Sequence, residues 1–360
     1  MPIWILLLIA LLLGAGIFFF YFLAGMVDRR INKCDYASTA GVSEEAIALH
    51  QKLLIADMHA DTFLWDRDFL KKNDRGHIDL PRMLEGNAAL QIFDSVTQTP
   101  KGINYNQNDD KTDNITLLCI ANRWPLRTWS SLLQRSLYNA ELIRKAAAAS
   151  NGKFSVITSK RELNDFLEKR KVDPKMAAGM MAMEGLHALE GKLENLDVLH
   201  KAGYRMMGLV HFFDNDAGGS STGMLKGGLT EFGREAIRRM EALYITVDLA
   251  HASQQLIDDV LKVATKPVVV SHTGVQGTRN VLRNLSDDHM RAVAASGGLV
   301  GIGFWEEAVG DISPAGIAKA IRYAVNLIGA DHVALGSDFD GAVSTNIDVA
   351  RSVLITDALL

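Results

Sequence analysis

Cysteine, basic clusters and, at the start of the chain, charge of either sign are scarce in this sequence. Cys34 and Cys119 are the only cysteines among 360 residues, too few for a disulfide framework or a thiolate zinc site. Any metal would therefore be held by histidine and carboxylate side chains. The formal net charge is -4 and there is no long basic block, which argues against nucleic acid as a partner.

The N-terminal segment lacks charge altogether. Residues 1–27 carry no charged side chain, and Ile3–Ala24 is almost wholly apolar. Because ~20 apolar residues in a helix cross a bilayer, we expect residues 1–27 to form a single transmembrane anchor. A signal peptide is the alternative, but it usually begins with basic residues and has a shorter apolar stretch. Three basic residues follow the span, and the positive-inside rule would place the next domain in the cytoplasm.

Beyond the anchor, the sequence indicates a polar linker over residues 28–42 and one large domain over residues 43–360. Eight short apolar runs recur in this domain. Most are continuous rather than alternating, which is typical of strands buried on both faces of a parallel sheet. They lie at residues 53–57, 88–96, 179–184, 204–211, 244–251, 267–272, 298–304 and 332–338.

Helical patterns lie between several of these runs, and the alternation predicts the α/β class, as a TIM-type (β/α)8 barrel. An open doubly wound sheet is the alternative, but no G-x-G-x-x-G follows the first strand to support it. The polar stretch Thr97–Asn114 would then lie on the catalytic face, as a rim, a lid or a plain surface loop. Few residues follow the eighth strand, so we expect the closing C-terminal helix to be truncated.

Acidic and histidine side chains stand where the predicted strands end. They are His59, Asp61, Glu184, His211, His251, His272 and Asp338. In a barrel these ends meet at one rim, which is where active sites lie. His59 and Asp61 are two residues apart in extended chain and can face the same ion.

Any one of these residues has an ordinary explanation, such as a hydrogen-bonded core histidine. Seven of them at one rim predict a carboxylate–imidazole site for zinc or another divalent ion. The set exceeds what one tetrahedral ion needs, so we expect a pair of ions that share a bridging carboxylate.

The segments DMHAD, MEGLHALE, GYRMMGLVHFFDNDAG, PVVVSHTGVQGTRNVL and LGSDFDG occur in this order along the chain. Together they resemble the membrane dipeptidase (renal dipeptidase) family of zinc peptidases, a branch of the metal-dependent amidohydrolase superfamily. The resemblance runs from about Leu53 to Leu360. It implies a zinc-dependent dipeptidase that hydrolyses the peptide bond of small dipeptides by means of a metal-bridging hydroxide.

The resemblance also implies a cofactor and its ligands. Two zinc ions, or another divalent metal, would be bound. His59 and Asp61 would hold one ion, His251 and His272 the other, and Glu184 would bridge both.

Three further roles follow from the same resemblance. His211 would stabilise the oxyanion of the tetrahedral intermediate, Arg279 would bind the C-terminal carboxylate of the substrate, and Asp338 would carry the proton from the attacking water to the leaving amine. The sequence also departs from animal members of the family. The segment from His272 to Arg279 is shorter, and Trp305 replaces a tyrosine near the substrate.

Other readings stay open at this point. The same ligands would serve a related amidohydrolase acting on N-acyl amino acids or D-residue dipeptides, and a degenerate barrel would bind without catalysis. Asp57, just before His59, is expected to support a histidine ligand from behind. By analogy with the family we expect a homodimer, and a domain on the periplasmic or extracellular side, against the charge rule.

Overall fold

A closed ring of parallel strands forms the centre of the computed structural model, which describes residues 1–360. β1 pairs with both β2 and β9, and β2 also pairs with β4, so the sheet has no open gap between its first and last barrel strands. The (β/α)8 barrel predicted from the sequence is confirmed, and each predicted apolar run overlaps one barrel strand. These are β1 (Ile55–Asp57), β2 (Ala88–Val96), β4 (Ala177–Glu184), β5 (Tyr204–Gly208), β6 (Thr246–Asp248), β7 (Val269–Thr273), β8 (Leu299–Ile302) and β9 (Val333–Leu335).

One short strand lies outside the ring and was not predicted. β3 (Phe154–Val156) pairs with the start of β4. Its Phe154 ring packs over Gly179, where an added Cβ would lie only 2.7 Å from that ring and 2.9 Å from the ring of Phe93. The apolar signal of three residues is too short to recognise, and only the contact with β4 makes this segment a strand.

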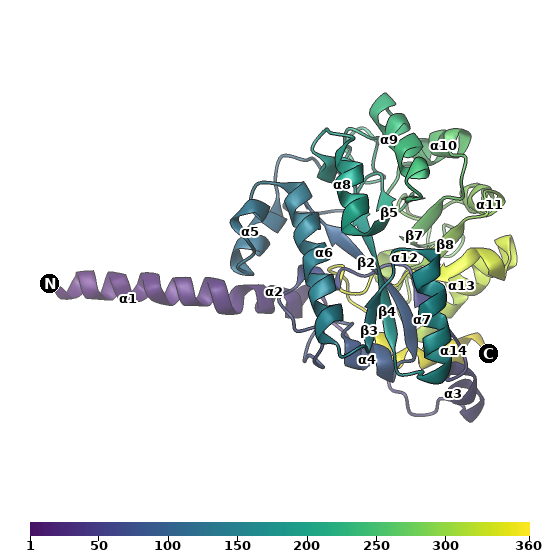
Figure 1. Ribbon diagram of the computed structural model, residues 1–360, viewed down its shortest axis with the longest axis horizontal. Helices are drawn as coiled ribbons and strands as arrows, with labels where there is room; N and C mark the ends of the chain where they lie inside the picture. Colours follow the sequence, from purple (N-terminus) through teal and green to yellow (C-terminus); the bar gives the residue numbers. More distant parts are fainter.

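Helices surround the barrel (Figure 1). Serine or threonine side chains cap several of them, as in α3, where the Ser43 hydroxyl accepts a hydrogen bond from the Ala46 N–H. Their bounds are α3 (Glu44–His50), α4 (Leu80–Glu85), α5 (Asn114–Ala121), α6 (Leu132–Ala149), α7 (Lys160–Val172), α8 (Asn195–Ala202), α9 (Glu231–Ala242), α10 (Gln254–Val263), α11 (Asp287–Ala295), α12 (Glu306–Val309), α13 (Pro314–Ile328) and α14 (Val353–Leu359).

The core consists of several clusters of buried hydrophobic side chains. A large cluster fills the space between strands and helices, while a small one consists of Met58, Ile92, Ala182, Met206 and Val269. The residues of the small cluster come from strands all round the ring, so they can meet only inside it. Side chains therefore fill the interior of the barrel, and a site can form only at the ends of its strands.

A long apolar helix projects from the barrel at the N-terminus (Figure 1). α1 (Ile3–Phe18), a π-helical segment η1 (Phe19–Leu23) and α2 (Ala24–Ile31) run on as one helix. Its mean hydropathy is 2.8 and none of its apolar window is buried. A membrane anchor and a signal sequence both have this form.

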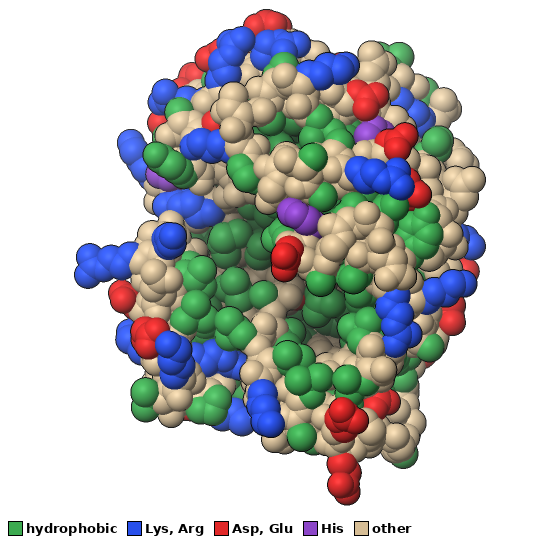
Figure 2. All heavy atoms as spheres, turned by 90° about the vertical axis from the view of Figure 1, so that its right-hand side faces the viewer, with side chains coloured by type: hydrophobic (Ala, Val, Ile, Leu, Met, Phe, Trp, Pro, Cys, Tyr) green, Lys and Arg blue, Asp and Glu red, His purple; other side chains and the backbone are tan.

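The opposite side of the molecule has a mixed surface. Figure 2 shows charged side chains of both signs around its periphery and hydrophobic side chains in hollows nearer its centre. The last turn of the C-terminal helix α14 belongs to this half of the molecule, and α14 packs against α13 and α3. The position after the eighth barrel strand, where we expected a truncated helix, is thus occupied by a helix of seven residues.

The residues after the apolar helix run along the barrel. Asp35 and Ala37 donate backbone hydrogen bonds to Thr345 and Asn346, and Thr345 donates one to Lys33. The segment expected to be a polar linker therefore follows the loop after β9. This contact brings the N-terminal helix to the C-terminal rim of the barrel.

Replacing Phe93 by alanine is expected to lower the free energy of unfolding by about 3–5 kcal/mol. Phe93 is fully buried, and its ring contacts the rings of Phe63, Phe69 and Phe154 with centroids 5.0, 5.6 and 6.0 Å away. Urea unfolding in detergent, followed by circular dichroism, measures the change. Leu126→Ala is the control, since Leu126 is 72% exposed and its substitution should change stability little. Equal effects of both substitutions would contradict the packing of Phe93 against the three rings.

Candidate metal centre

Seven buried side chains gather at the C-terminal rim of the barrel. They are His59, Asp61, Glu184, His211, His251, His272 and Asp338, all predicted from the sequence. Each follows or ends a different strand, except that His59 and Asp61 both follow β1. The structure forms three groups with ligand atoms within 4.8 Å of one another: His59, Glu184 and His272; Glu184, His211 and His251; and His59, Asp61 and Asp338.

His59 faces three carboxylates without a hydrogen bond to any of them. Its Nε2 lies 3.7 Å from Asp61 Oδ1, 3.6 Å from Glu184 Oε1 and 3.7 Å from Asp338 Oδ1. This nitrogen is fully buried and has no hydrogen-bond partner. Ligands held at roughly 2.0–2.2 Å by one ion have comparable separations from each other. The donor atoms around His59 therefore fit a shared cation better than a hydrogen-bonded core.

Glu184 lies between the histidines of the other strands. Its Oε1 is 3.3 Å from His251 Nε2 and 3.5 Å from His272 Nε2, and its Oε2 is 3.1 Å from His211 Nε2. The two Nε2 atoms of His251 and His272 are 2.9 Å apart. Because Glu184 belongs to two of the three groups, its carboxylate is placed to serve two ions at once.

Burial sets the charge of this cluster. It raises the pKa of the Glu184 and Asp338 carboxyls well above their ordinary values, and it holds the pKa of His211, His251 and His272 well below theirs. The three imidazoles are thus neutral, with lone pairs available. Acids crowded together away from water need a compensating cation, and neutral imidazole with carboxylate suits zinc and similar divalent ions.

His59 differs from the other histidines because of Asp94. Burial by itself lowers the pKa of His59, but Asp94 and Glu184 more than offset this and raise it. Asp94 Oδ2 lies 3.0 Å from His59 Nδ1 and burial raises the pKa of Asp94 to about 6. The carboxylate behind Nδ1 holds the proton on that nitrogen, so Nε2 is the nitrogen that would give up its proton to bind a cation in the ligand cluster.

A similar support stands behind His272. Ser271 Oγ donates to Asp248 Oδ2 at 2.5 Å and lies 3.0 Å from His272 Nδ1. Since the hydroxyl proton is used on Asp248, the hydroxyl oxygen accepts from the Nδ1–H of His272. The Nε2 of His272 is then unprotonated and faces Glu184.

Sequence reasoning gave the supporting role to Asp57 and missed Asp94 and Asp248. Asp57 Oδ1 accepts hydrogen bonds from the backbone N–H groups of Ser337 and His59, so it ties the ends of β1 and β9 together and does not touch the imidazole ring. Asp94 did carry a signal, since it is an acid inside the continuous apolar run of β2. Only the folded barrel shows that this acid lies against the His59 ring.

Backbone strain is concentrated at the same rim. His251, Asp338, Asp340 and Ala342 have φ angles of 64°, 61°, 65° and 61°, in the left-handed region. Such conformations cost of order 1–3 kcal/mol each in residues other than glycine and persist only where the surroundings enforce them. Three of the four lie in the loop after β9, which carries Asp338.

A cavity of about 720 Å³ opens above the cluster. Glu184, His211, His251, His272 and Asp338 line one part of it. The predicted rim segment contributes as well: Thr99, Ile103, Tyr105 and Asn114 line the cavity, as does Trp305. Its size falls within the usual range of small-molecule sites, ~300–1,000 Å³.

The structure does not bring Arg279 to this cavity. Arg279 is exposed, because the chain after β7 turns outward where the Arg279 N–H donates to the Val275 carbonyl. Arg283, further along the same loop, is buried, lines the cavity and donates from Nη2 to the His272 carbonyl at 3.0 Å. The guanidinium that lines the cavity is thus that of Arg283 and not that of Arg279.

Comparison with known proteins agrees with this geometry. Residues 43–360 match the family described as membrane dipeptidase (Peptidase family M19). A protein from the pqqA 5' region of Klebsiella pneumoniae, described as uncharacterized, is 30% identical over 213 residues, which cover 56% of this chain and 77% of that protein. An uncharacterized dipeptidase of Schizosaccharomyces pombe is 28% identical over 276 residues (74% of this chain, 61% of that protein), and the dipeptidase tcpJ of Claviceps purpurea is 24% identical over 328 residues (89% and 72%).

Solved structures show the same architecture. A metallo peptidase from Rhodobacter sphaeroides, liganded with a phosphinate mimic of the dipeptide L-Ala-D-Ala, is 25% identical with a TM-score of 0.66, covering 85% of this chain and 90% of that one. The probable dipeptidase PvdM from Pseudomonas aeruginosa has a TM-score of 0.73 at 18% identity, covering 89% and 93%. The second likeness concerns the fold alone.

Asp94→Asn is expected to weaken metal binding by about 10–100-fold, because the amide cannot hold the proton on His59 Nδ1 as a carboxylate does. Competition with a chromogenic zinc chelator measures the affinity. Asp197→Asn is the matched control: Asp197 lies on the outer helix α8 and pairs with Arg239 at the surface, so its substitution should leave the affinity unchanged. Equal affinities of the Asp94 variant and the wild type would contradict the role given to Asp94.

Proposed function

The chain belongs to the membrane dipeptidase family of metallopeptidases, and on that premise we propose that it is a two-zinc dipeptidase acting on small dipeptides. The observation that carries this proposal is the position of Glu184 between two sets of ligands, at the bottom of a cavity that Arg283 also lines. A surface ion pair or a structural zinc site would need neither a carboxylate shared by two ligand sets nor a cavity beside it.

The ligands divide into two sets. His59 and Asp61 would hold one ion, His251 and His272 the other, and Glu184 would join them. Other divalent metals could occupy the same donors. When bound, a pair of ions lowers the pKa of a shared water and polarises the carbonyl to be cleaved.

Three residues would act on the substrate directly. Arg283 would bind the C-terminal carboxylate, for which a guanidinium offers two parallel donors. His211 Nδ1 is buried without a partner, so it is free to donate to the carbonyl oxygen as charge develops there. Asp338, whose pKa burial raises, would accept the proton of the attacking water and return it to the leaving amine.

The substrate class rests on the cavity and on one relative. The metallo peptidase from Rhodobacter sphaeroides binds a mimic of a dipeptide with a D-residue at its C-terminal position, which supports small dipeptides, including such stereoisomers, for this chain. N-acyl amino acids are the alternative substrate class. A non-catalytic barrel is disfavoured, because none of the seven predicted rim residues is missing from the cluster.

The placement of the enzyme in the cell completes the proposal. The N-terminal helix would anchor residues 43–360 to a membrane, with the domain on the periplasmic or extracellular side. A homodimer is proposed by analogy with the family alone.

The purified full chain is expected to hydrolyse dipeptides, to lose this activity on treatment with a strong chelator, and to regain it with zinc. His251→Ala should reduce kcat/KM by at least 10³-fold, because it removes a ligand. Ninhydrin assay of a dipeptide panel, with L- and D-residues and N-acyl amino acids, gives the rates. His200→Ala, on the outer helix α8, is the control and should behave as wild type. Hydrolysis insensitive to chelation and to His251→Ala would refute the proposal.

Arg283→Ala and Arg279→Ala separate the two arginines of one loop. Removing the buried Arg283 should lower kcat/KM for dipeptides by about 10²-fold, chiefly through a higher KM, because a charge-assisted pair is worth roughly 2–3 kcal/mol. Removing the exposed Arg279 should change kcat/KM less than twofold. Steady-state kinetics on a dipeptide measures both variants, and the reverse order of effects would restore Arg279 as the carboxylate ligand.

A further inference from the structure

The end of the N-terminal helix reaches the active-site cavity. Leu23, Ala24, Val27 and Ile31 line the same cavity as the metal-centre residues. On the adjoining part of this helix, the Asp28 carboxylate is buried against the barrel, with 1% of its side chain exposed. A helix that serves only as a tether has no need of a buried acid, and burying one is costly unless it is paired.

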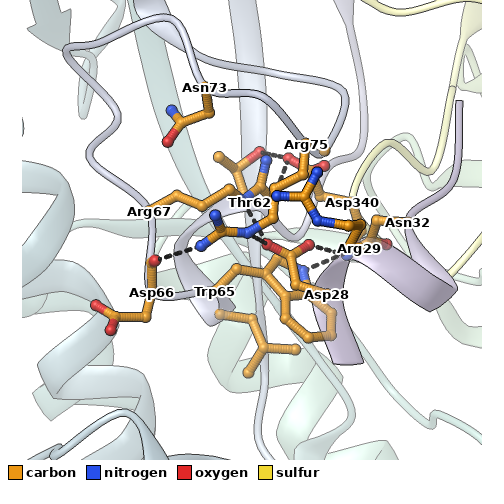
Figure 3. A network of polar contacts seen from close by, with 12 residues as sticks. Asp28, Arg29, Asn32, Thr62, Trp65, Asp66, Arg67, Asn73, Arg75 and Asp340 are labelled. Atoms are coloured by element: carbon orange, nitrogen blue, oxygen red, sulfur yellow. Dashed lines mark hydrogen bonds and ion pairs between the residues drawn. The ribbon is translucent and has the colours of Figure 1, made fainter. Parts of the chain in front are cut away.

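Asp28 is paired with two arginines from the loop after β1. Its Oδ2 lies 3.2 Å from Arg67 Nε and 2.8 Å from Arg75 Nε. Arg67 Nη2 in turn lies 2.8 Å from Asp340 Oδ2, and the Arg67 side chain is almost fully buried. Figure 3 shows the Arg67 guanidinium between the two carboxylates, with the helix bearing Asp28 beside it.

The helix makes a second contact with the same loop after β9. The Asn32 amide donates to Asp28 Oδ1 at 2.9 Å, and its oxygen accepts a hydrogen bond from the Ala342 N–H at 2.8 Å. Asp340 and Ala342 are two of the left-handed residues in this loop. One helical turn thus holds the loop at two points, through Arg67 and through Asn32.

Asp340 is also held from the barrel side. Its Oδ2 accepts from the Thr62 hydroxyl and its Oδ1 from the His77 N–H, at 2.8 and 2.7 Å. Trp65 Nε1 donates to the Asp340 carbonyl at 2.7 Å. All these contacts converge on a residue two positions from Asp338, the side chain that faces His59.

We infer that Asp28 is a positioning residue for catalysis: through Arg67 and Asn32 it holds the strained loop after β9 so that the Asp338 carboxylate stays directed at the metal centre. The juxtamembrane turn is then part of the active site. This inference rests on the proposed function for the role of Asp338. Without Asp28, Arg67 keeps one of its two acidic partners and Arg75 keeps only the exposed Asp74. The loop after β9 then loses one of its two attachments to the helix, and the contact through Asn32 loses its Asp28 support. The metal ligands keep their own contacts.

Kinetics of four variants of the full chain in detergent test the inference. Asp28→Ala should lower kcat by about 10-fold or more, since small displacements of a catalytic group are costly, with KM within about threefold of wild type and metal content unchanged. Asp28→Glu keeps the charge and should recover at least part of kcat. Asn32→Ala, which removes the other contact with the loop, should lower kcat by a smaller factor. Arg29→Ala is the matched control, because Arg29 lies on the same helix and pairs with exposed Asp74.

Equal kcat values for Asp28→Ala and Arg29→Ala would overturn the inference. Loss of bound metal or of folded protein in Asp28→Ala, with wild-type kinetics in Asn32→Ala, would also overturn it, because Asp28 would then serve stability alone.

Hydrogen exchange measures the attachment of the loop after β9 without any substrate. The N–H groups of Asp340 and Ala342 are bonded to His77 Nδ1 and Asn32 Oδ1, and they should exchange faster in Asp28→Ala than in Arg29→Ala. Absence of dipeptide hydrolysis by the wild type would refute the proposed function and not the loop attachment, which exchange decides by itself. Unchanged exchange in Asp28→Ala would refute the attachment even if the enzyme hydrolyses dipeptides.

Discussion

Glu184 contacts imidazoles from four other strand ends, and the carboxylate reaches all of them from the last position of β4. That position is buried, so the acid is stable there only with positive charge nearby. The buried Asp338 carboxylate shares the same need, and Arg283 and His59 alone do not meet it. A pair of divalent ions would meet it, and the three neutral histidines would offer their lone pairs to such ions.

Polar groups outside the cluster support its histidines. Asp94 and the Ser271–Asp248 pair stand behind two of the histidines and fix which nitrogen carries the proton. The loop after β9 is strained, because its left-handed residues, including Asp338 itself, adopt an unfavourable backbone conformation. Contacts from the loop after β1 and from the N-terminal helix hold it. Ligand orientation and loop position are thus maintained by separate sets of polar contacts that meet at one rim.

Much of this could be read from the chain. Continuous apolar runs with helical patterns between them gave all eight barrel strands, and the polar residues at their ends gave the cluster, because parallel strands bring their carboxyl ends to one face. Asp57 and Arg279 show the limit of that reasoning. Both are polar residues close in sequence to ligands, yet Asp57 bonds to backbone amides and Arg279 points outward. In loops, the direction of a side chain depends on turns that spacing does not specify, so Arg283 could not be preferred from the sequence.

The sequence by itself determined the order of apolar runs, the residue types at their ends and the uncharged N-terminal segment, since periodicity and composition are local properties. It left undetermined which acids stand behind the ligands, which arginine enters the cavity, and that the apolar helix lies against the active site. Those depend on contacts between residues far apart in the chain, such as Asp28 with Arg67 and Arg67 with Asp340. Only the closed barrel, which brings the loops after β1 and β9 to the same rim as the N-terminal helix, decides them.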